Sequence, residues 1–270
     1  MAKDDKNKDT LITLLVGIVL VLSILILILT LFKGKKIDTN GDLVTELYAK
    51  LGQNDLSYCD GLSYYSDAKV DYDSLSNTNR LCNALVDLYM KEDFTVMKVD
   101  KAKKNNTCTI GDSITFATDS QEDNLCSVDR YDKEKINQKY RDIYGKDIDK
   151  YEKLYLNSTV VCYPDDDYYY CGLAENYSVT IGKEPETFRN IKEVRQKDDM
   201  IIIYDYFLKM IQDECYRSFT GDVKYDDCSM KYSNMKEVNY EFIKRYGTLY
   251  RHTFKKDENG TYYWVSSKPK

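Results

Sequence analysis

The sequence predicts an α+β protein in which an N-terminal transmembrane helix precedes a disulfide-stabilised ectodomain of mixed helices and antiparallel sheet. Residues 10–32 form an apolar run without a single charge, and all eight cysteines follow that run. Beyond it, segments with helical spacing and segments with strand-like alternation both occur, and turn residues separate them. Helices and hairpins in one chain place the folded part in the α+β class.

The apolar run is long enough to cross a bilayer as a helix. At 1.5 Å per residue, residues 10–32 extend roughly 34 Å, against a hydrocarbon core of about 30 Å. A cleavable signal peptide has a shorter apolar region and a small-residue cleavage site, which Leu31–Gly34 does not offer. The polar residues of the apolar run carry hydroxyls that can hydrogen-bond back to their own helix: Thr10, Thr13, Ser23 and Thr30. We therefore expect an uncleaved anchor that contacts the lipid bilayer through residues 10–32.

The orientation of this anchor is predicted from the cysteines, because lysines flank the run about equally on both sides. The cysteines are even in number, and none lies in the C-x-x-C spacing of a metal site. This favours disulfides and an oxidising compartment, with residues 1–9 in the cytoplasm and the folded part outside the cell membrane. Reduced thiols in a cytoplasmic domain are the alternative. The predicted disulfide residues are Cys59, Cys82, Cys108, Cys126, Cys162, Cys171, Cys215 and Cys228.

The cysteines pair most simply as neighbours along the chain. Cys162 and Cys171 lie on the two arms of one predicted hairpin. The other neighbouring pairs bracket short stretches of chain: Cys59–Cys82, Cys108–Cys126 and Cys215–Cys228. Eight cysteines allow about 105 connectivities, so other pairings stay open at this point.

The composition restricts the partners. The chain has a formal net charge of −6 and a sequence pI near 5.1, which argues against nucleic acid and against adhesion to anionic lipid headgroups. It has 26 tyrosines, against 8 phenylalanines and one tryptophan. A ligand-binding surface is one interpretation of this excess. We favour the other, that tyrosine reflects AT-rich codons and suits half-buried strands.

The predicted organisation has five parts. Residues 1–9 form a tail, 10–32 the transmembrane helix and 33–42 a short linker, and they are followed by a helix-rich part over 43–150 and a strand-rich part over 151–270. Helical spacing with capping or stop residues predicts helices over residues 42–51, 76–91, 132–144 and 234–246.

Strands are predicted where residues alternate or are rich in β-branched and aromatic types. Residues 154–163 and 168–173 flank an acidic turn and form one hairpin. A C-terminal hairpin over 249–255 and 261–266 surrounds Asn259-Gly260, a strong turn signal. The remaining predicted strands are residues 94–99, 107–110, 113–118, 177–183 and 200–211, with a helix as the alternative for 200–211 because of its length.

The sequence offers little catalytic chemistry. The single histidine, His252, lies in a predicted strand, where an exposed or hydrogen-bonded structural role is expected. No Ser-His-Asp or Cys-His arrangement can be built from spacing, and no phosphate-binding loop or H-E-x-x-H zinc motif occurs. Asp38–Asp42 begins like a calcium loop, but Leu43 and Ala49 occupy its glycine and glutamate positions. We therefore predict no catalytic residue, no metal and no cofactor.

Residues 234–264, a helix followed by the hairpin with Tyr250-Arg251-His252 and Tyr262-Tyr263-Trp264, carry a resemblance. With the charged tail and the single span, the chain resembles uncharacterised membrane-anchored extracytoplasmic proteins of low-GC Gram-positive bacteria, although its cysteine content is high for that group. The C-terminal half also resembles cystatin-like and NTF2-like α+β folds, in which a curved sheet wraps a helix. Neither resemblance implies a site residue.

Three functions are compatible with these observations. The first is a non-enzymatic binding or interaction protein anchored outside the cell membrane, whose ligand is an unidentified protein, peptide or glycan. The alternatives are a membrane-tethered, carboxylate-dependent hydrolase of a surface polymer, and a structural subunit of a membrane complex.

Overall fold

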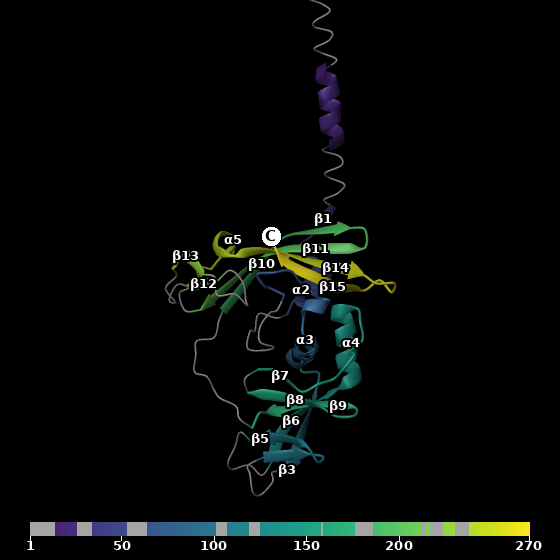
Figure 1. The fold of residues 1–270 in the computed structure, drawn as a ribbon, viewed down its shortest axis with the longest axis vertical. Helices are drawn as coiled ribbons and strands as arrows, with labels where there is room; N and C mark the ends of the chain where they lie inside the picture. The colour runs from purple at the N-terminus through teal and green to yellow at the C-terminus, as the bar shows by residue number, and fades with distance from the viewer. Residues whose placement is uncertain are drawn as a thin grey trace, which may run out of the picture.

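The computed structural model describes residues 14–25, 34–52, 64–100, 107–118, 125–157, 159–175, 186–211, 214–216, 224–229 and 238–270, with the backbone alone at 224–229. Within these residues the fold is α+β with antiparallel sheets, as predicted. A large sheet and a smaller sheet lie at opposite ends, and three helices occupy the space between them (Figure 1).

The large sheet has eight strands and is antiparallel throughout. Its central strand β11 has mostly apolar and mostly buried side chains. Its order is β1 (Lys35–Ile37), β10 (Glu186–Lys197), β11 (Met200–Ile211), β14 (Thr248–Lys256), β15 (Tyr262–Pro269) and β2 (Val70–Asp71), with β12 (Glu214–Tyr216) and β13 (Lys224–Ser229) continuing from one end of β11.

The second sheet has five strands and draws them from both halves of the chain. Strand β6 pairs with β9, so that Asp129 lies opposite Cys171. The hydrogen bonds between β6 and β9 therefore connect the predicted parts over 43–150 and 151–270. The order is β3 (Thr95–Asp100), β6 (Leu125–Asp132), β9 (Tyr168–Leu173), β8 (Val160–Pro164) and β7 (Leu154–Tyr155), and a separate pair consists of β4 (Thr107–Ile110) and β5 (Ile114–Ala117).

Three of the four predicted helices begin and end close to the predicted residues, and the last begins later. The helices of the folded part are α2 (Asp42–Ala49), α3 (Asn77–Met90), α4 (Lys133–Tyr144) and α5 (Tyr240–Tyr246), together with the short 3-10 helix η1 (Tyr72–Ser74), which was not predicted. The Ser76 side chain accepts from the Asn79 backbone N–H and caps α3, and Asp132 accepts from Glu134 and caps α4. Gly145 ends α4 in the left-handed conformation that glycine adopts without strain.

One continuous core joins the two sheets through the helices. It combines Leu47 of α2, Leu85 of α3 and Ile143 of α4 with Ile203 and Phe254 of the large sheet. Tyrosine supplies much of this core, and the fully buried tyrosines are Tyr64, Tyr65, Tyr131, Tyr140, Tyr144, Tyr169 and Tyr250. These burials support the interpretation of tyrosine as a structural residue here.

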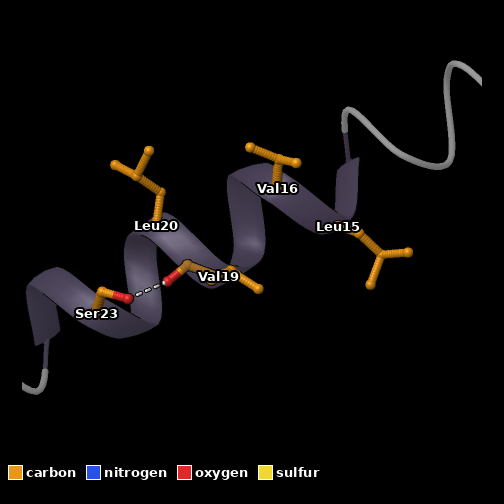
Figure 2. Close-up of a pocket in the computed structure, with 5 residues that line it drawn as sticks. All are labelled: Leu15, Val16, Val19, Leu20 and Ser23. Carbon is orange, nitrogen blue, oxygen red and sulfur yellow. Dashed lines mark hydrogen bonds between the residues drawn. The ribbon is translucent and has the colours of Figure 1, made fainter.

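Residues 14–25 form a helix that projects away from the folded part (Figure 1). Its apolar side chains are exposed on all sides, with exposed fractions between 49% and 63%. The Ser23 hydroxyl donates to the Val19 carbonyl at 2.8 Å, the predicted bond back to its own helix (Figure 2). Among the described residues, no helix combines the length and the apolar character needed to span a membrane.

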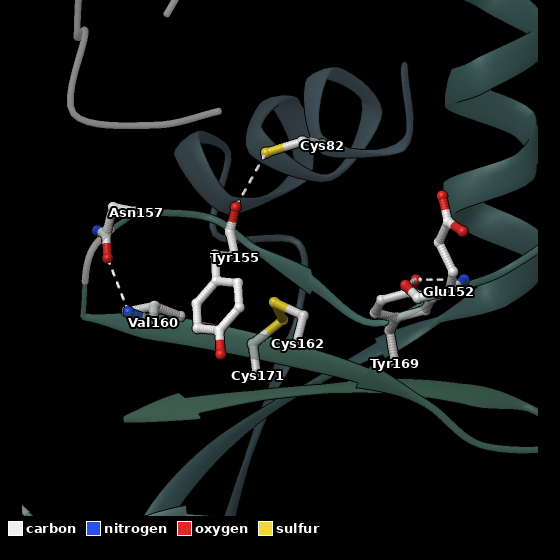
Figure 3. The surroundings of a disulfide bond; sticks show 8 residues. All are labelled: Cys82, Glu152, Tyr155, Asn157, Val160, Cys162, Tyr169 and Cys171. Carbon is white, nitrogen blue, oxygen red and sulfur yellow. Dashed lines mark hydrogen bonds between the residues drawn. A yellow bond between two sulfur atoms is a disulfide. The ribbon is translucent and has the colours of Figure 1, made fainter. Parts of the chain in front are cut away.

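Several elements differ from the predictions. Strand β1 lies within the predicted linker, and β6 and β10 were not predicted. The predicted strand over 154–163 is divided into β7 and β8, because the Asn157 side-chain oxygen accepts the backbone N–H groups of Thr159 and Val160 in a local turn (Figure 3).

The last helix begins later than predicted. The Asn239 side chain accepts from the Phe242 backbone N–H and caps α5, so the helix starts at Tyr240 and not at Asn234. Residue 234 and the strand predicted over 177–183 lie outside the described residues.

Two predicted disulfides are present. Cys162 is bonded to Cys171 across β8 and β9, with a Cα–Cα distance of 4.1 Å (Figure 3). Cys108 is bonded to Cys126, with a Cα–Cα distance of 6.1 Å. Cys82 and Cys215 are also disulfide-bonded. Their predicted partners, Cys59 and Cys228, lie outside the described side chains, so those two pairings stay predictions.

Candidate functional site

Three polar residues meet on the face of the large sheet that packs against the helices. Asp205 on β11, His252 on β14 and Ser267 on β15 have an exposed fraction of 0% each. Ser267 lies opposite His252 in the register, and His252 lies opposite Ile203, two residues before Asp205. Because side chains at every second position of a strand share a face, the three point to the same side of the sheet.

A β-bulge brings Ser267 to this face. In the pairing of β14 with β15, Phe254 lies opposite Trp264 and Thr253 opposite Ser266, which leaves Val265 as an extra residue. The extra residue reverses the alternation, so that Trp264 and Ser267 are both buried on the inner side. Regular alternation would have placed Ser266 there instead.

The three residues form a continuous chain of hydrogen bonds. His252 Nε2 lies 2.8 Å from Asp205 Oδ1, and His252 Nδ1 lies 2.6 Å from Ser267 Oγ. The indole N–H of Trp264 donates to Ser267 Oγ at 2.9 Å. The imidazole donates to the Asp205 carboxylate from Nε2, and its Nδ1 shares a hydrogen bond with the Ser267 hydroxyl. Both ring nitrogens therefore have a hydrogen-bond partner, as a buried polar network requires.

Two tyrosines complete the coordination of the carboxylate. Tyr48 of α2 and Tyr65 donate their hydroxyls to Asp205 Oδ2 at 2.8 and 2.7 Å. Arg189 of β10 lies at the edge of this group, where its guanidinium carbon is 4.8 Å from the Tyr48 ring centroid. Arg189 Nη2 also donates to the Gly52 carbonyl at 2.7 Å, which ties the end of α2 to the sheet.

The environment sets the ionisation of these groups. Burial by itself raises the pKa of Asp205, but the charge and hydrogen bond of His252 and the two tyrosine hydroxyls outweigh burial and hold this pKa below its ordinary value. Burial, followed by the Asp205 charge, raises the pKa of Tyr65 well above its ordinary value. Asp205 is therefore a carboxylate at neutral pH, and Tyr65 stays protonated as its donor.

An Asp-His-Ser series is the arrangement of a serine hydrolase, but this one differs in two respects. In such enzymes the carboxylate binds Nδ1 and the serine binds Nε2, whereas here the two contacts are exchanged. Ser267 Oγ also has no exposed surface and accepts from Trp264, so a substrate has no access to it in this conformation. The arrangement as it stands connects three strands and α2.

A second polar cluster lies between α3 and α4. The hydroxyls of Tyr64 and Tyr144 lie 2.9 Å apart, and the Asn83 side-chain amide donates to both. Burial raises the pKa of Tyr144 to about 12. Nearby, Arg80 Nε donates to the Tyr140 hydroxyl at 2.9 Å. These tyrosine hydroxyls are all engaged in hydrogen bonds inside the protein.

Sequence spacing did not predict that Asp205, His252 and Ser267 would meet, yet the structure brings them together. His252 was expected to be either exposed or hydrogen-bonded in a structural role. It is hydrogen-bonded and buried. The sequence signal that could have placed them together was the alternation of side chains along the strands. Asp205 is two residues from Ile203 and Phe207, and His252 is two residues from Tyr250 and Phe254, so both polar residues lie on the same face as apolar core residues. Within the described part of the chain, no cluster of residues suited to a metal ion occurs.

Comparison with known proteins gave no relative. No family model, no curated protein and no solved structure matches the chain.

Proposed function

We propose that the chain is an interaction protein held at the outer side of a cell membrane by residues 10–32, with its disulfide-bonded part outside the cytoplasm. The supporting observation is the combination of an uncharged helix whose apolar side chains are exposed all round with cysteines that are disulfide-bonded wherever the structure describes them. Exposed apolar surface of this extent is stable in lipid and costly in water. Disulfides persist in oxidising compartments.

The anchor is tested by alkaline carbonate extraction of membranes from cells that express the full chain. The chain is expected in the membrane pellet, and a Leu20→Arg/Ile24→Arg variant is expected in the supernatant, because each arginine at the centre of a span costs about 2.5–3.5 kcal/mol. The matched control is Val96→Arg/Leu125→Arg, which changes apolar residues of similar exposure outside the run. Release of the unmodified chain by carbonate would contradict the anchor.

The compartment is tested by thiol alkylation in the same cells. A maleimide mass tag is added after denaturation, with and without prior reduction. We expect no tagged cysteine without reductant and all eight after reduction. Tagging of all eight cysteines without reductant would place the folded part in a reducing compartment.

A hydrolase is the second candidate, and the hydrogen-bond series from Asp205 through His252 to Ser267 is the observation that favours it. It requires a conformation that exposes Ser267 Oγ. A fluorophosphonate probe tests this directly, since covalent labelling of Ser267 in the full chain, lost in Ser267→Ala and kept in Ser266→Ala, would support a hydrolase. Absence of labelling under native conditions favours the interaction protein.

A further inference from the structure

The outer face of the large sheet carries a set of cations, which we call the basic face: Lys36, Arg195, Lys197, Arg251, Lys255 and Lys268. The register places them together. Lys36 lies opposite Arg195, and Arg251 lies opposite Lys268. Lys197 and Lys255 are both opposite Met200. Paired residues share a face, and the alternate positions on the same strands carry the buried inner residues Ile203, His252 and Ser267. The basic face therefore points away from α2, α3 and α4, and α5 packs on the same side of the sheet at the other end of β11.

Acidic residues on the same side only partly offset these charges. Glu193 lies 3.0 Å from Arg195. Asp71 is 2.7 Å from Lys69, and Asp199 is 3.9 Å from Lys255. Lys36, Lys255 and Lys268 are exposed. The chain as a whole carries a formal net charge of −6, so its excess of acidic residues lies outside the basic face.

A tyrosine lies among the cations. Tyr204 pairs with Arg251 on the outer face. The Lys270 ammonium lies 4.8 Å from the Tyr204 ring centroid. Tyr204 is partly exposed. Cations interleaved with tyrosine are typical of protein surfaces at the level of lipid headgroups.

The chain connectivity keeps this face near the membrane. Lys35, the first residue of β1, follows the predicted span by three residues, which reach at most about 11 Å when fully extended. β1 is an edge strand of the large sheet and pairs with β10. In Figure 1 the helix of residues 14–25 lies beyond this sheet, on the side away from α2, α3 and α4. A face tethered so closely meets the bilayer surface at high effective concentration.

We propose that the basic face docks on the anionic lipid headgroups of the membrane in which residues 10–32 are anchored, and so holds the large sheet against the bilayer. The proposal rests on the proposed anchor. It reverses the expectation, drawn from net charge, that the chain avoids anionic headgroups. Each cation near an anionic bilayer contributes attraction equivalent to roughly a fivefold change in an equilibrium constant.

The test uses the full chain in nanodiscs of phosphatidylcholine alone or of phosphatidylcholine mixed with anionic phosphatidylglycerol. The rate of amine acylation at Lys255 is measured by mass spectrometry relative to that at Lys150, an exposed lysine outside the large sheet. We expect acylation at Lys255 to be at least about fivefold slower in anionic discs than in neutral ones. High salt is expected to remove the difference, because it screens the attraction.

A charge-reversal variant identifies the surface. In Lys36→Glu/Lys268→Glu, Lys255 is expected to react equally fast in both kinds of disc. The matched control, Lys98→Glu/Lys135→Glu, removes two exposed lysines outside the large sheet and is expected to keep the protection. Loss of protection in the control as well would overturn the assignment to the basic face.

The outcomes separate this proposal from the anchor. Failure of the chain to copurify with either disc would contradict the anchor. Copurification with equal acylation of Lys255 in both discs would leave the anchor intact and overturn the docking. Protection by soluble polyphosphate in neutral discs, without protection in anionic discs, would also overturn it, in favour of a soluble polyanion.

Discussion

Asp205 Oδ1 and His252 Nε2 lie 2.8 Å apart, and neither side chain has any exposed surface. The two residues come from neighbouring strands, and two tyrosine hydroxyls and Ser267 complete their hydrogen bonds. Burying an isolated carboxylate is costly, and this one is stable because each oxygen has a donor. The group therefore links β11, β14, β15 and α2.

Removal of the carboxylate should be strongly destabilising. In Asp205→Ala, the hydroxyls of Tyr48 and Tyr65 and the His252 Nε2 lose their acceptor inside the core. We expect the free energy of unfolding in urea to fall by about 3–5 kcal/mol. Asp199→Ala, at an exposed position of the β10–β11 turn, is the control and should stay within about 0.5 kcal/mol. Equal losses in the two variants would disprove a special role for Asp205.

The contribution of Asp205 should depend on pH in a defined direction. Its pKa in the folded protein lies below its ordinary value of about 3.9, so its stabilisation is fully present above that pH and is lost as the pH falls through the folded value. The difference in unfolding free energy between the native sequence and Asp205→Asn should therefore be constant near neutrality and shrink below about pH 4. Urea titrations at a series of pH values measure it. A difference that grows on acidification would refute the lowered pKa.

Alanine substitutions at the adjacent residues Ser267 and Ser266 should have different effects on stability. Ser267→Ala leaves the Trp264 indole N–H and His252 Nδ1 without a partner in the core, at a cost of about 1–3 kcal/mol. Ser266 lies on the other face, and Ser266→Ala should cost less than about 0.5 kcal/mol. The near-ultraviolet circular dichroism of the single tryptophan should change only in Ser267→Ala. The reverse order of effects would mean that the bulge at Val265 is misplaced.

Two glycines in the left-handed conformation provide a matched pair. Gly145 has φ +66°, and a Cβ there would lie 2.7 Å from the Tyr263 ring, whereas Gly111 has φ +59° and open space around it. Gly111→Ala should cost about 1–2 kcal/mol from the backbone alone. Gly145→Ala should cost about 1–3 kcal/mol more, because α4 must move away from β15. Thermal unfolding compares them, and equal costs would exclude close packing at Gly145.

The two described disulfides should stabilise the fold to similar extents. Cys162→Ala/Cys171→Ala opens a loop with a sequence separation of 9, and Cys108→Ala/Cys126→Ala opens one with a separation of 18. Each pair should contribute roughly 2–4 kcal/mol, and the longer loop about 0.6 kcal/mol more. Urea unfolding of both double variants measures this. No loss of stability in either would show that the bridges do not restrict the unfolded chain.

Local sequence signals predicted the elements that depend on neighbouring residues. The helices α3 and α4 begin after Ser76 and Asp132, because a side-chain oxygen at the cap satisfies a free backbone N–H group. The hairpin of β14 and β15 turns at Asn259-Gly260, where Gly260 has a positive φ. Both described disulfides join cysteines that are neighbours along the chain, because closing the short loop between them costs little entropy.

The sequence by itself thus determined the α+β class, three of the described helices, the C-terminal hairpin and two of the neighbouring cysteine pairs. The tertiary structure alone decided that β6 pairs with β9 across residue 150, and that a bulge at Val265 brings Ser267 to His252 and Asp205. It also decided that cations gather on one face of an acidic chain. The physical reason is that strand pairing and register are set by packing between residues far apart in sequence, whereas caps and turns are set within a few residues.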